Sequence, residues 1–142
     1  MTDTAAGYDY FEVAADVGVR AWGPSRAEAF AQTTLGVFAL IVSPDDVEPR
    51  ETREVRAQGD SAEHLLVNWI NECLYVHEIE GFVVRQVEVS ACGDTLVHGL
   101  LRGEEIDRTR HRPGTIVKAA TFHQVAVETR GGRVETRLIV DV

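Results

Sequence analysis

The stretch that decides the fold is Ser61-Ala62-Glu63-His64-Leu65-Leu66-Val67-Asn68-Trp69-Ile70-Asn71-Glu72-Cys73-Leu74-Tyr75. Its apolar residues recur at helical spacing and would share one face, made of Leu65, Leu66, Trp69, Ile70, Cys73 and Leu74. Asp60 or Ser61 can cap the first turn, and Gly81 can close the last one. An apolar face of this size must be buried, so the stretch predicts a central core helix.

A second helix is predicted earlier in the chain, where Ser25-Arg26-Ala27-Glu28 has the form of a capping box. The Ser25 hydroxyl can accept a hydrogen bond from the backbone near Glu28, and the Glu28 carboxylate can reach back. A wide apolar stripe follows at helical spacing, through Ala27, Phe30, Ala31, Leu35, Val37, Phe38 and Ile41. Pro44 and the two aspartates after it should end this helix.

The second half of the chain has the pattern of β-strands, because apolar residues alternate with polar ones over 83–89. The expected strands are 83–89, 95–102, 115–129 and 133–142, with turns at Gly93-Asp94 and Gly131-Gly132 and a polar loop over 103–114. Strands that precede, separate and follow two helices predict an α+β fold, in which a mostly antiparallel or mixed sheet is covered by two main helices.

Length and composition indicate one domain, because 142 residues with 44% apolar content suit a single core over residues 1–142. The formal net charge of −9 argues against tight unassisted binding to nucleic acid, which needs a basic surface. A protein partner or a cation is the expected ligand. No apolar run approaches the roughly 20 residues of a membrane span, and the polar start lacks a secretory signal. We therefore expect a cytoplasmic protein, with Cys73 and Cys92 as reduced thiols.

Two separated acidic residues suggest a cation site. Asp141-Val142 follows a strand-like run, which places a carboxylate side chain one residue from the terminal carboxylate. Asp16 interrupts another strand-like segment, over 11–19. If these strands are neighbours, their oxygen atoms can share one hard cation. The alternatives are that Asp16 accepts backbone amides in a turn next to Gly18 and that Asp141 is a solvated, frayed end.

Several segments, in order along nearly the whole chain, resemble the archease family, whose members assist RtcB-type RNA ligases. The segments that carry the resemblance are Tyr10-Phe11-Glu12, Ala15-Asp16-Val17-Gly18-Val19, the first helix, Leu65 to Tyr75, Ile116 to His123, and Leu138-Ile139-Val140-Asp141-Val142. The resemblance implies an archease-like fold and a divalent metal site at Asp16, Asp141 and Val142. Where the family usually has His-Thr-Ala-Asp, this chain has Val13-Ala14-Ala15-Asp16, so an imidazole and a hydroxyl are missing.

The same resemblance implies a function without catalysis by the protein itself. Such a protein would speed guanylylation of the ligase's active-site histidine and restore multiple turnover in tRNA splicing or RNA repair. The oxygen ligands predict calcium, magnesium or manganese as the cation. Other classes remain open: a stand-alone metal-dependent hydrolase, and a general chaperone of RNA-modifying enzymes. A serine hydrolase is disfavoured because no serine lies in Gly-x-Ser-x-Gly.

Three residues are candidates for contact with the partner: Lys118, His123 and Glu105. Lys118 lies in a segment that matches the family, and alternation along the predicted strand 115–129 would place His123 on the opposite face, beside Val125. The simpler interpretations are a solvated lysine and a structural histidine. Glu105 belongs to a charged stretch from Glu104 to Arg112, which serves either solubility or partner contact.

Overall fold

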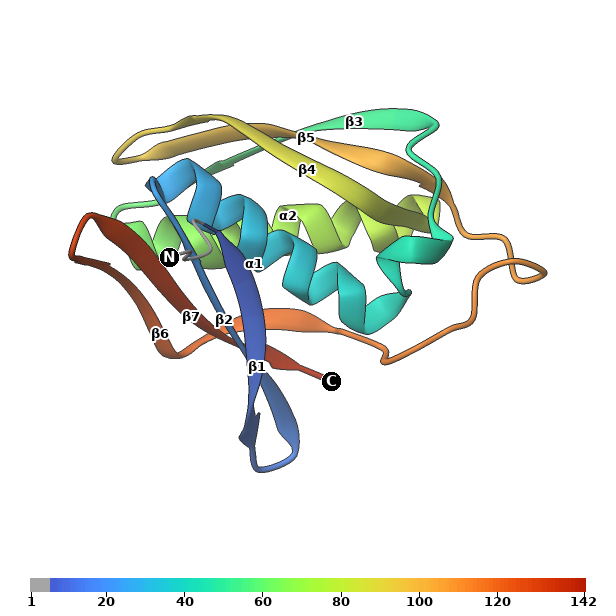
Figure 1. Ribbon diagram of the computed structural model, residues 1–142, viewed down its shortest axis with the longest axis horizontal. Coiled ribbons are helices and arrows are strands. Elements are labelled where there is room, and N and C mark those ends of the chain that lie inside the picture. Colours follow the sequence, from blue (N-terminus) through green and yellow to red (C-terminus); the bar gives the residue numbers. More distant parts are fainter. Residues whose placement is uncertain (1–5) are drawn as a thin grey trace.

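The computed structural model describes residues 6–142, in which two helices lie between two antiparallel sheets (Figure 1). The four-stranded sheet has the order β1 (Gly7–Val13), β2 (Asp16–Gly23), β7 (Arg133–Asp141), β6 (Ala119–Arg130). The three-stranded sheet has the order β3 (Glu51–Gln58), β5 (Leu96–Glu105), β4 (Phe82–Cys92). The predicted α+β class is confirmed, but the strands form two sheets instead of one.

Both helices begin at the predicted caps. The Ser25 hydroxyl accepts from the Glu28 amide at 3.1 Å ahead of α1 (Arg26–Ile41), and the Ser61 hydroxyl accepts from the His64 amide at 3.1 Å ahead of α2 (Ala62–Glu80). Gly81 ends α2 with φ 66°, a left-handed conformation that suits glycine. Helix α1 stops at Ile41, before a short 3₁₀ turn η1 (Pro44–Asp46) that contains the proline predicted to end it.

The core lies between the two sheets and is centred on α2. Five of the six residues predicted for its apolar face have no exposed surface, and Leu74 is 5% exposed. Trp69 is fully buried, and its indole N–H donates to the Thr34 hydroxyl at 2.8 Å, which joins the two helices. Hydroxyls of Thr33 and Thr136 meet at 2.7 Å, which joins α1 to β7. Among the side chains of residues 6–142, every buried nitrogen and oxygen has a hydrogen-bond partner.

The expected elements differ from the structure in four places. The segment 11–19 is the tip of a β1–β2 hairpin, whose two strands pair from Gly7↔Trp22 to Val13↔Asp16. We did not predict strand β3, which consists mostly of charged and polar residues and has only two buried positions. Residues 115–118 lie outside β6, which begins at Ala119. Strand β5 extends two residues beyond Gly103 into the predicted polar loop.

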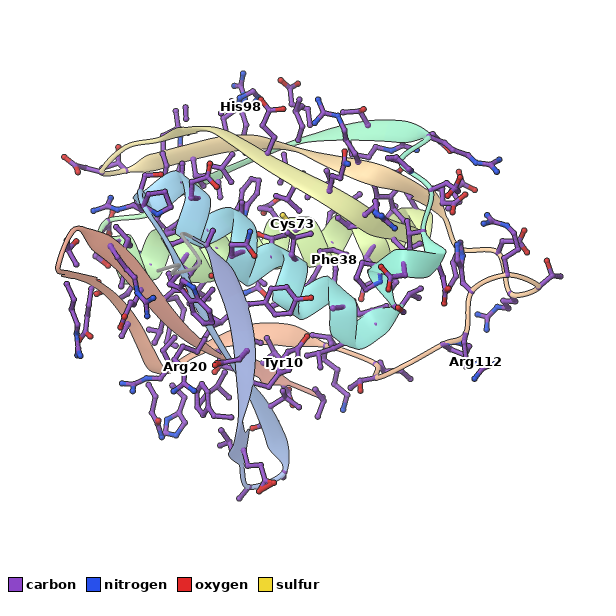
Figure 2. The ribbon with its side chains drawn as sticks, viewed as in Figure 1. Tyr10, Arg20, Phe38, Cys73, His98 and Arg112 are labelled. Atoms are coloured by element: carbon purple, nitrogen blue, oxygen red, sulfur yellow. The ribbon has the colours of Figure 1, made fainter. Side chains whose placement is uncertain are left out.

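The side chains fill the space between the layers (Figure 2). Cys73 is buried inside the core and Cys92 is partly buried near the end of β4, and both are unpaired thiols. Burial raises the pKa of the Cys73 thiol, with a smaller contribution from Glu72. No helix within residues 6–142 combines the length and the apolar character needed to cross a bilayer.

Candidate cation site and partner surface

Strand pairing brings Asp16 and Asp141 to the same end of the four-stranded sheet. Strands β2 and β7 are antiparallel, and their register runs from Gly23↔Val134 to Val17↔Val140. Asp16 and Asp141 are the next residues beyond this last pair. Directly opposed residues in an antiparallel pair have Cα atoms about 4.5–5.5 Å apart. Continuing the register by one step would set the two aspartates opposite each other, which stays a prediction.

Both aspartates belong to the outer face of this sheet, away from the helices. In β2, Val19 and Ala21 are fully buried against the core. Side chains alternate between the two faces of a strand, so Asp16, an odd number of positions away from both, belongs to the opposite face. In β7, Leu138 and Val140 are buried in the same way, which gives Asp141 the outward parity. Side chains of directly opposed residues share a face, so the two carboxylates project from the same side.

The hairpin tip fixes Asp16 at the first position of β2. Ala15 has φ 67°, a left-handed conformation that closes the tight connection from Val13 to Asp16. Behind the tip, the Phe11 ring covers Gly18, where an added Cβ would come within 2.3 Å of the ring. Glycine is required there for this close approach. Asp16 itself is partly buried.

Nothing within residues 6–142 balances the two carboxylates. Neither aspartate takes part in an ion pair. No backbone amide donates to the Asp16 side chain in that part of the chain, in contrast to the alternative of a turn aspartate. The nearby Lys118 uses its backbone N–H, which donates to the Asp141 carbonyl at 2.8 Å.

Val142 follows Asp141 and is anchored by packing. Its side chain is partly buried against the hydrophobic core. We call Asp16, Asp141 and Val142 the acidic corner. Its donor set is made of oxygen atoms, which hard cations such as calcium, magnesium and manganese prefer. Because only two acidic side chains contribute, no group of three or more histidine, cysteine, aspartate or glutamate side chains marks a metal site within the described residues.

The three candidate partner residues do not form one cluster. Lys118 is exposed beside the acidic corner, whereas Glu105 lies at the end of β5 in the other sheet. His123 is exposed on β6, but the predicted alternation of faces is wrong. Thr121 pairs with Ile139, and the next pair is Ala126 with Arg137. Between these two pairs β6 advances by five residues but β7 by only two. This bulge, in which Gln124 has φ 55°, breaks the alternation.

The charged stretch after β5 contains a buried cluster that the sequence analysis treated as surface. Glu104 is 4% exposed and His111 is 1% exposed. The His111 Nδ1 atom accepts from the Asp107 amide at 2.8 Å, so the ring proton is on Nε2, which donates to the Glu104 carboxylate at 3.0 Å. The Glu48 amide and the Arg110 guanidinium also donate to this carboxylate, at 2.8 and 2.7 Å. We call this arrangement the Glu104 cluster.

Hydrogen bonds decide the ionisation of Glu104. Burial raises the pKa of its carboxyl group, but the donors Arg110, Glu48 and His111 together outweigh burial and lower the pKa to about 2. The carboxylate is therefore charged at neutral pH and holds residues 104–111 against the start of β3. The signal that sequence reasoning missed is the spacing of an acidic residue and a histidine within an otherwise exposed charged run.

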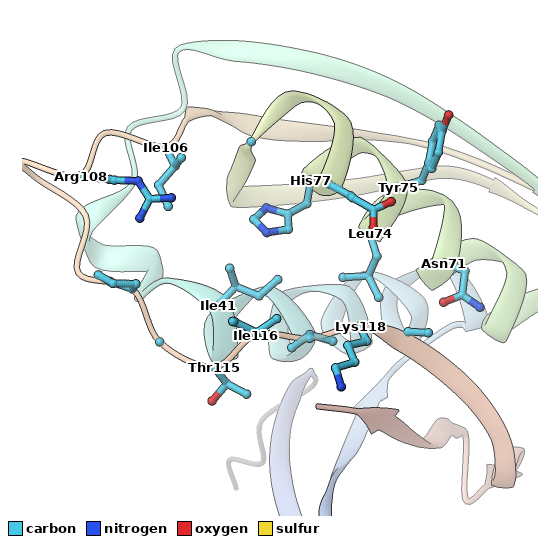
Figure 3. A pocket seen from close by; sticks show the side chains of 16 residues that line it. Ile41, Asn71, Leu74, Tyr75, His77, Ile106, Arg108, Thr115, Ile116 and Lys118 are labelled. Atoms are coloured by element: carbon cyan, nitrogen blue, oxygen red, sulfur yellow. The ribbon is translucent and has the colours of Figure 1, made fainter.

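A groove of about 710 Å³ opens between α2 and the segment 113–119, next to the acidic corner (Figure 3). Its lining comes from the end of α1, the C-terminal half of α2, and residues 106–119. Asn71 ties the two walls together, because its side chain donates to the Ala120 carbonyl at 3.3 Å and accepts from the Ala120 amide at 2.7 Å. Sequence analysis gave no sign of this groove.

Comparisons with known proteins agree with the fold and extend over nearly the whole chain. The family model described as "Archease protein family (MTH1598/TM1083)" matches residues 8–142. "Protein archease" of Pyrococcus abyssi is 36% identical over 139 residues, which cover 95% of this chain and 98% of that protein. "Protein archease" of Saccharolobus islandicus is 39% identical over 137 residues, with the same coverage of 95% and 98%.

Two solved structures are similar as well. The solution structure of Methanobacterium thermoautotrophicum protein 1598 is 31% identical, covers 96% of this chain and 99% of its own, and has a TM-score of 0.79. The crystal structure of a Thermotoga maritima archease, titled a possible chaperone, is 18% identical with a TM-score of 0.61 and covers 93% and 94%, which shows the common fold. By the family model and these relatives, the chain belongs to the archease family.

Proposed function

We propose that this protein is a non-catalytic activator of an RtcB-type RNA ligase. In this proposal it speeds the attachment of guanylate to the ligase's active-site histidine and restores multiple turnover in tRNA splicing or RNA repair, in the cytoplasm. The observation that carries the proposal is the pairing of β2 with β7, whose last pair, Val17↔Val140, is directly followed by Asp16 and Asp141 at one end of the sheet. The ligase as partner is what the family resemblance implies, and it is part of this proposal.

The acidic corner would hold one divalent cation, calcium, magnesium or manganese. Asp16 and Asp141 would each offer a carboxylate oxygen, and Val142 a backbone oxygen. A divalent cation bound there would supply positive charge that offsets negative charge on nucleotide phosphates. The chain's own contribution is positional: the Ala15 turn and the packing of Val142 hold the oxygen donors at a rigid sheet end.

Charge and exposure support docking through this end of the molecule. The net charge of −9 favours a partner that is basic around its nucleotide site, because complementary charge speeds association. Lys118 is exposed beside the acidic corner and would contact an acidic group or a phosphate of the partner. His123 and Glu105 lie further away and would contact it only across a wide interface.

The hairpin tip departs from the family pattern in a way that bears on the cation. Val13 and Ala14 replace the family's usual histidine and threonine, so no imidazole or hydroxyl at these positions can orient the Asp16 carboxylate. Residues that orient a ligand commonly change metal affinity by about 10–100-fold. We therefore propose a site of reduced affinity, which fills only when the cation is abundant or when the partner adds oxygen ligands.

A guanylylation assay tests the proposal. The ligase from the same organism is mixed with GTP and a divalent cation, with and without this protein, and the rate of guanylate attachment is measured. The expected result is a faster rate and more than one turnover per ligase. An unchanged rate contradicts the activator function. Asp16→Asn with Asp141→Asn should abolish the effect, whereas Asp9→Asn, an aspartate paired with Arg20 on β1, should preserve it.

The same preparation separates the alternative functions. Hydrolysis of phosphate esters by the protein alone, lost on chelation, would indicate a stand-alone metal-dependent hydrolase. Suppression of aggregation of unrelated proteins, unaffected by Asp16→Asn, would indicate a general chaperone. Stimulation of the ligase without either of these activities is the outcome that the proposal predicts.

A further inference from the structure

We propose that the groove between α2 and residues 113–119 binds an extended, apolar segment of the partner protein that carries a carboxylate. This inference rests on the proposed function, because it takes the ligase as the protein that supplies the segment. It concerns a surface beside the acidic corner, made of different side chains. Its support comes from exposed apolar groups, unpaired backbone amides and a local reversal of charge.

Apolar side chains are exposed along the groove. Ile116 is 79% exposed and Tyr75 is 59% exposed, although both line a concave surface. Ile41, Leu74 and Val117 form buried parts of the same lining. In Figure 3, Leu74 and Tyr75 extend from α2, and Ile116 comes from the segment across from it. Exposed apolar groups around a concavity are typical of surfaces that bind a partner.

The segment that carries Ile116 has backbone groups available for pairing. The amides of Gly114 and Thr115 donate to Ile41 and Leu40, and the Lys118 amide donates to Asp141. The amides of Ile116 and Val117, between them, have no backbone acceptor within residues 6–142. Successive amides of an extended segment point to opposite sides, so one of these two can donate to a carbonyl oxygen of a peptide that is added along the groove. An extended occupant therefore fits this wall.

The charge of the groove is opposite to that of the whole protein. Its fully charged side chains are Arg108, Lys118 and Glu78, a net of +1, while the whole chain carries −9. Arg108 and Lys118 form no ion pair with any of residues 6–142. Lys118 is also the only lysine in the sequence. Two unpaired cations beside an apolar lining favour a segment that bears aspartate or glutamate.

The groove is continuous with the acidic corner. Lys118 and Ala119 belong to its lining, and Ala119 pairs directly with Asp141. A segment lying along residues 115–118 would therefore end next to the two aspartates. This placement explains how one partner could engage both surfaces at once, with the groove supplying apolar contact and orientation.

Binding measurements with matched variants test the groove. The affinity of the same ligase is measured for the wild type, for Ile116→Glu and for Arg108→Glu. Each variant is expected to raise the dissociation constant about tenfold, as loss of one important interface contact does. Leu96→Glu is the control, because Leu96 is also exposed, at 43%, but lies on β5 outside the groove lining. It should change the constant by less than about twofold.

The single lysine allows a second test on the intact complex. A carbodiimide joins an ammonium group to a carboxylate that touches it, so a cross-link at Lys118 identifies the partner residue facing the groove. The expected product links Lys118 to an aspartate or glutamate within an apolar stretch of the ligase, and Lys118→Arg abolishes it. Peptide mapping separates this product from any link to the terminal amine.

The outcomes distinguish this inference from the proposed function. If the wild type stimulates the ligase but Ile116→Glu and Arg108→Glu bind as tightly as Leu96→Glu, the groove proposal is wrong and the activator function stands. If binding follows the groove variants but guanylylation is not accelerated, only the activator function is wrong. If sedimentation shows a dimer that Ile116→Glu dissociates, the occupant is a second copy of the chain, which overturns the partner segment.

Discussion

Carboxylates occur at two places in this molecule under opposite conditions. In the Glu104 cluster the carboxylate is buried and receives hydrogen bonds from His111, Arg110 and the Glu48 amide. At the acidic corner, Asp16 and Asp141 lie at a sheet end, and no ion pair within the described residues includes them. The Glu104 carboxylate is compensated by side chains and backbone of the protein itself, whereas the two aspartates have no ion-pair partner within residues 6–142.

Burial and hydrogen-bond partners indicate different roles for the acidic residues in this fold. A buried charge must be compensated internally, because the cost of removing it from water is otherwise too large. An exposed charge does not need compensation for stability, so an uncompensated pair at a rigid position is more informative about binding. The Glu104 cluster is accordingly expected to control stability, and the acidic corner is expected to control cation binding.

The largest expected effect is on stability. Glu104→Ala removes the acceptor that His111 and Arg110 share, and breaking a buried charged network of this kind costs about 3–5 kcal/mol in free energy of unfolding. Asp16→Ala should change that free energy by less than about 0.5 kcal/mol, because it breaks no contact in the cation-free protein. Urea denaturation with a chelator present measures both. Equal losses in the two variants would remove the distinction between the regions.

Lowering the pH should reduce the free energy of unfolding, and Glu104 should account for part of that loss. The pKa of Glu104 is about 2 in the folded protein, against an ordinary value of 4.5. A lowered pKa means that Glu104 contributes its full stabilisation above pH 4.5 and loses it as the pH falls towards 2. Urea unfolding at pH 6 and pH 3 should show a drop in stability that is smaller in Glu104→Gln than in the wild type. Parallel losses in both proteins would show that Glu104 is not the group responsible.

Restoring the hairpin tip should strengthen the acidic corner. Val13→His combined with Ala14→Thr supplies an imidazole and a hydroxyl next to Asp16, and we expect calcium affinity to rise about 10–100-fold. Calorimetric titration measures the change. The matched control carries the same two substitutions together with Asp16→Asn and should gain nothing. A gain that persists in this control would indicate a new site built by the histidine.

Removing Val142 should have the smallest effect. The deletion removes the proposed oxygen ligand of Val142, so calcium affinity should fall severalfold, by roughly 1 kcal/mol or less. Val142→Ala keeps the backbone oxygen and loses only part of the side-chain packing, so it serves as the control. Titration of the two variants separates ligation from packing. Unchanged affinity after the deletion would exclude Val142 from the ligand set.

Much of the fold could be predicted from residues whose role is local. Ser25, Ser61 and Gly81 cap helices through contacts within a few positions, and the apolar face of α2 repeats with the helical period. The division into two sheets could not be predicted, because it depends on which strands pair across the chain. Strand β3 was missed because six of its eight residues are charged or polar and only Val55 and Ala57 are buried.

The candidate site could be predicted from the sequence only in part. The family resemblance indicated Asp16 and Asp141, and the pairing of β2 with β7 brings both to the same end of the sheet. The face of His123 was predicted wrongly, because the bulge after Thr121 has no signal in the alternation of apolar residues. Glu104 and His111 looked like surface charges, since burial of a charged pair depends on tertiary contacts with Glu48 and Arg110.

The central claim is that Asp16 and Asp141 bind the same cation. Crystals of the wild-type protein soaked in a calcium salt test it most directly, with calcium located by its anomalous scattering. We expect one calcium ion with a carboxylate oxygen of each aspartate at about 2.3–2.6 Å. Calcium bound to only one of the two aspartates, or an acidic corner without calcium at saturating concentration, would contradict it.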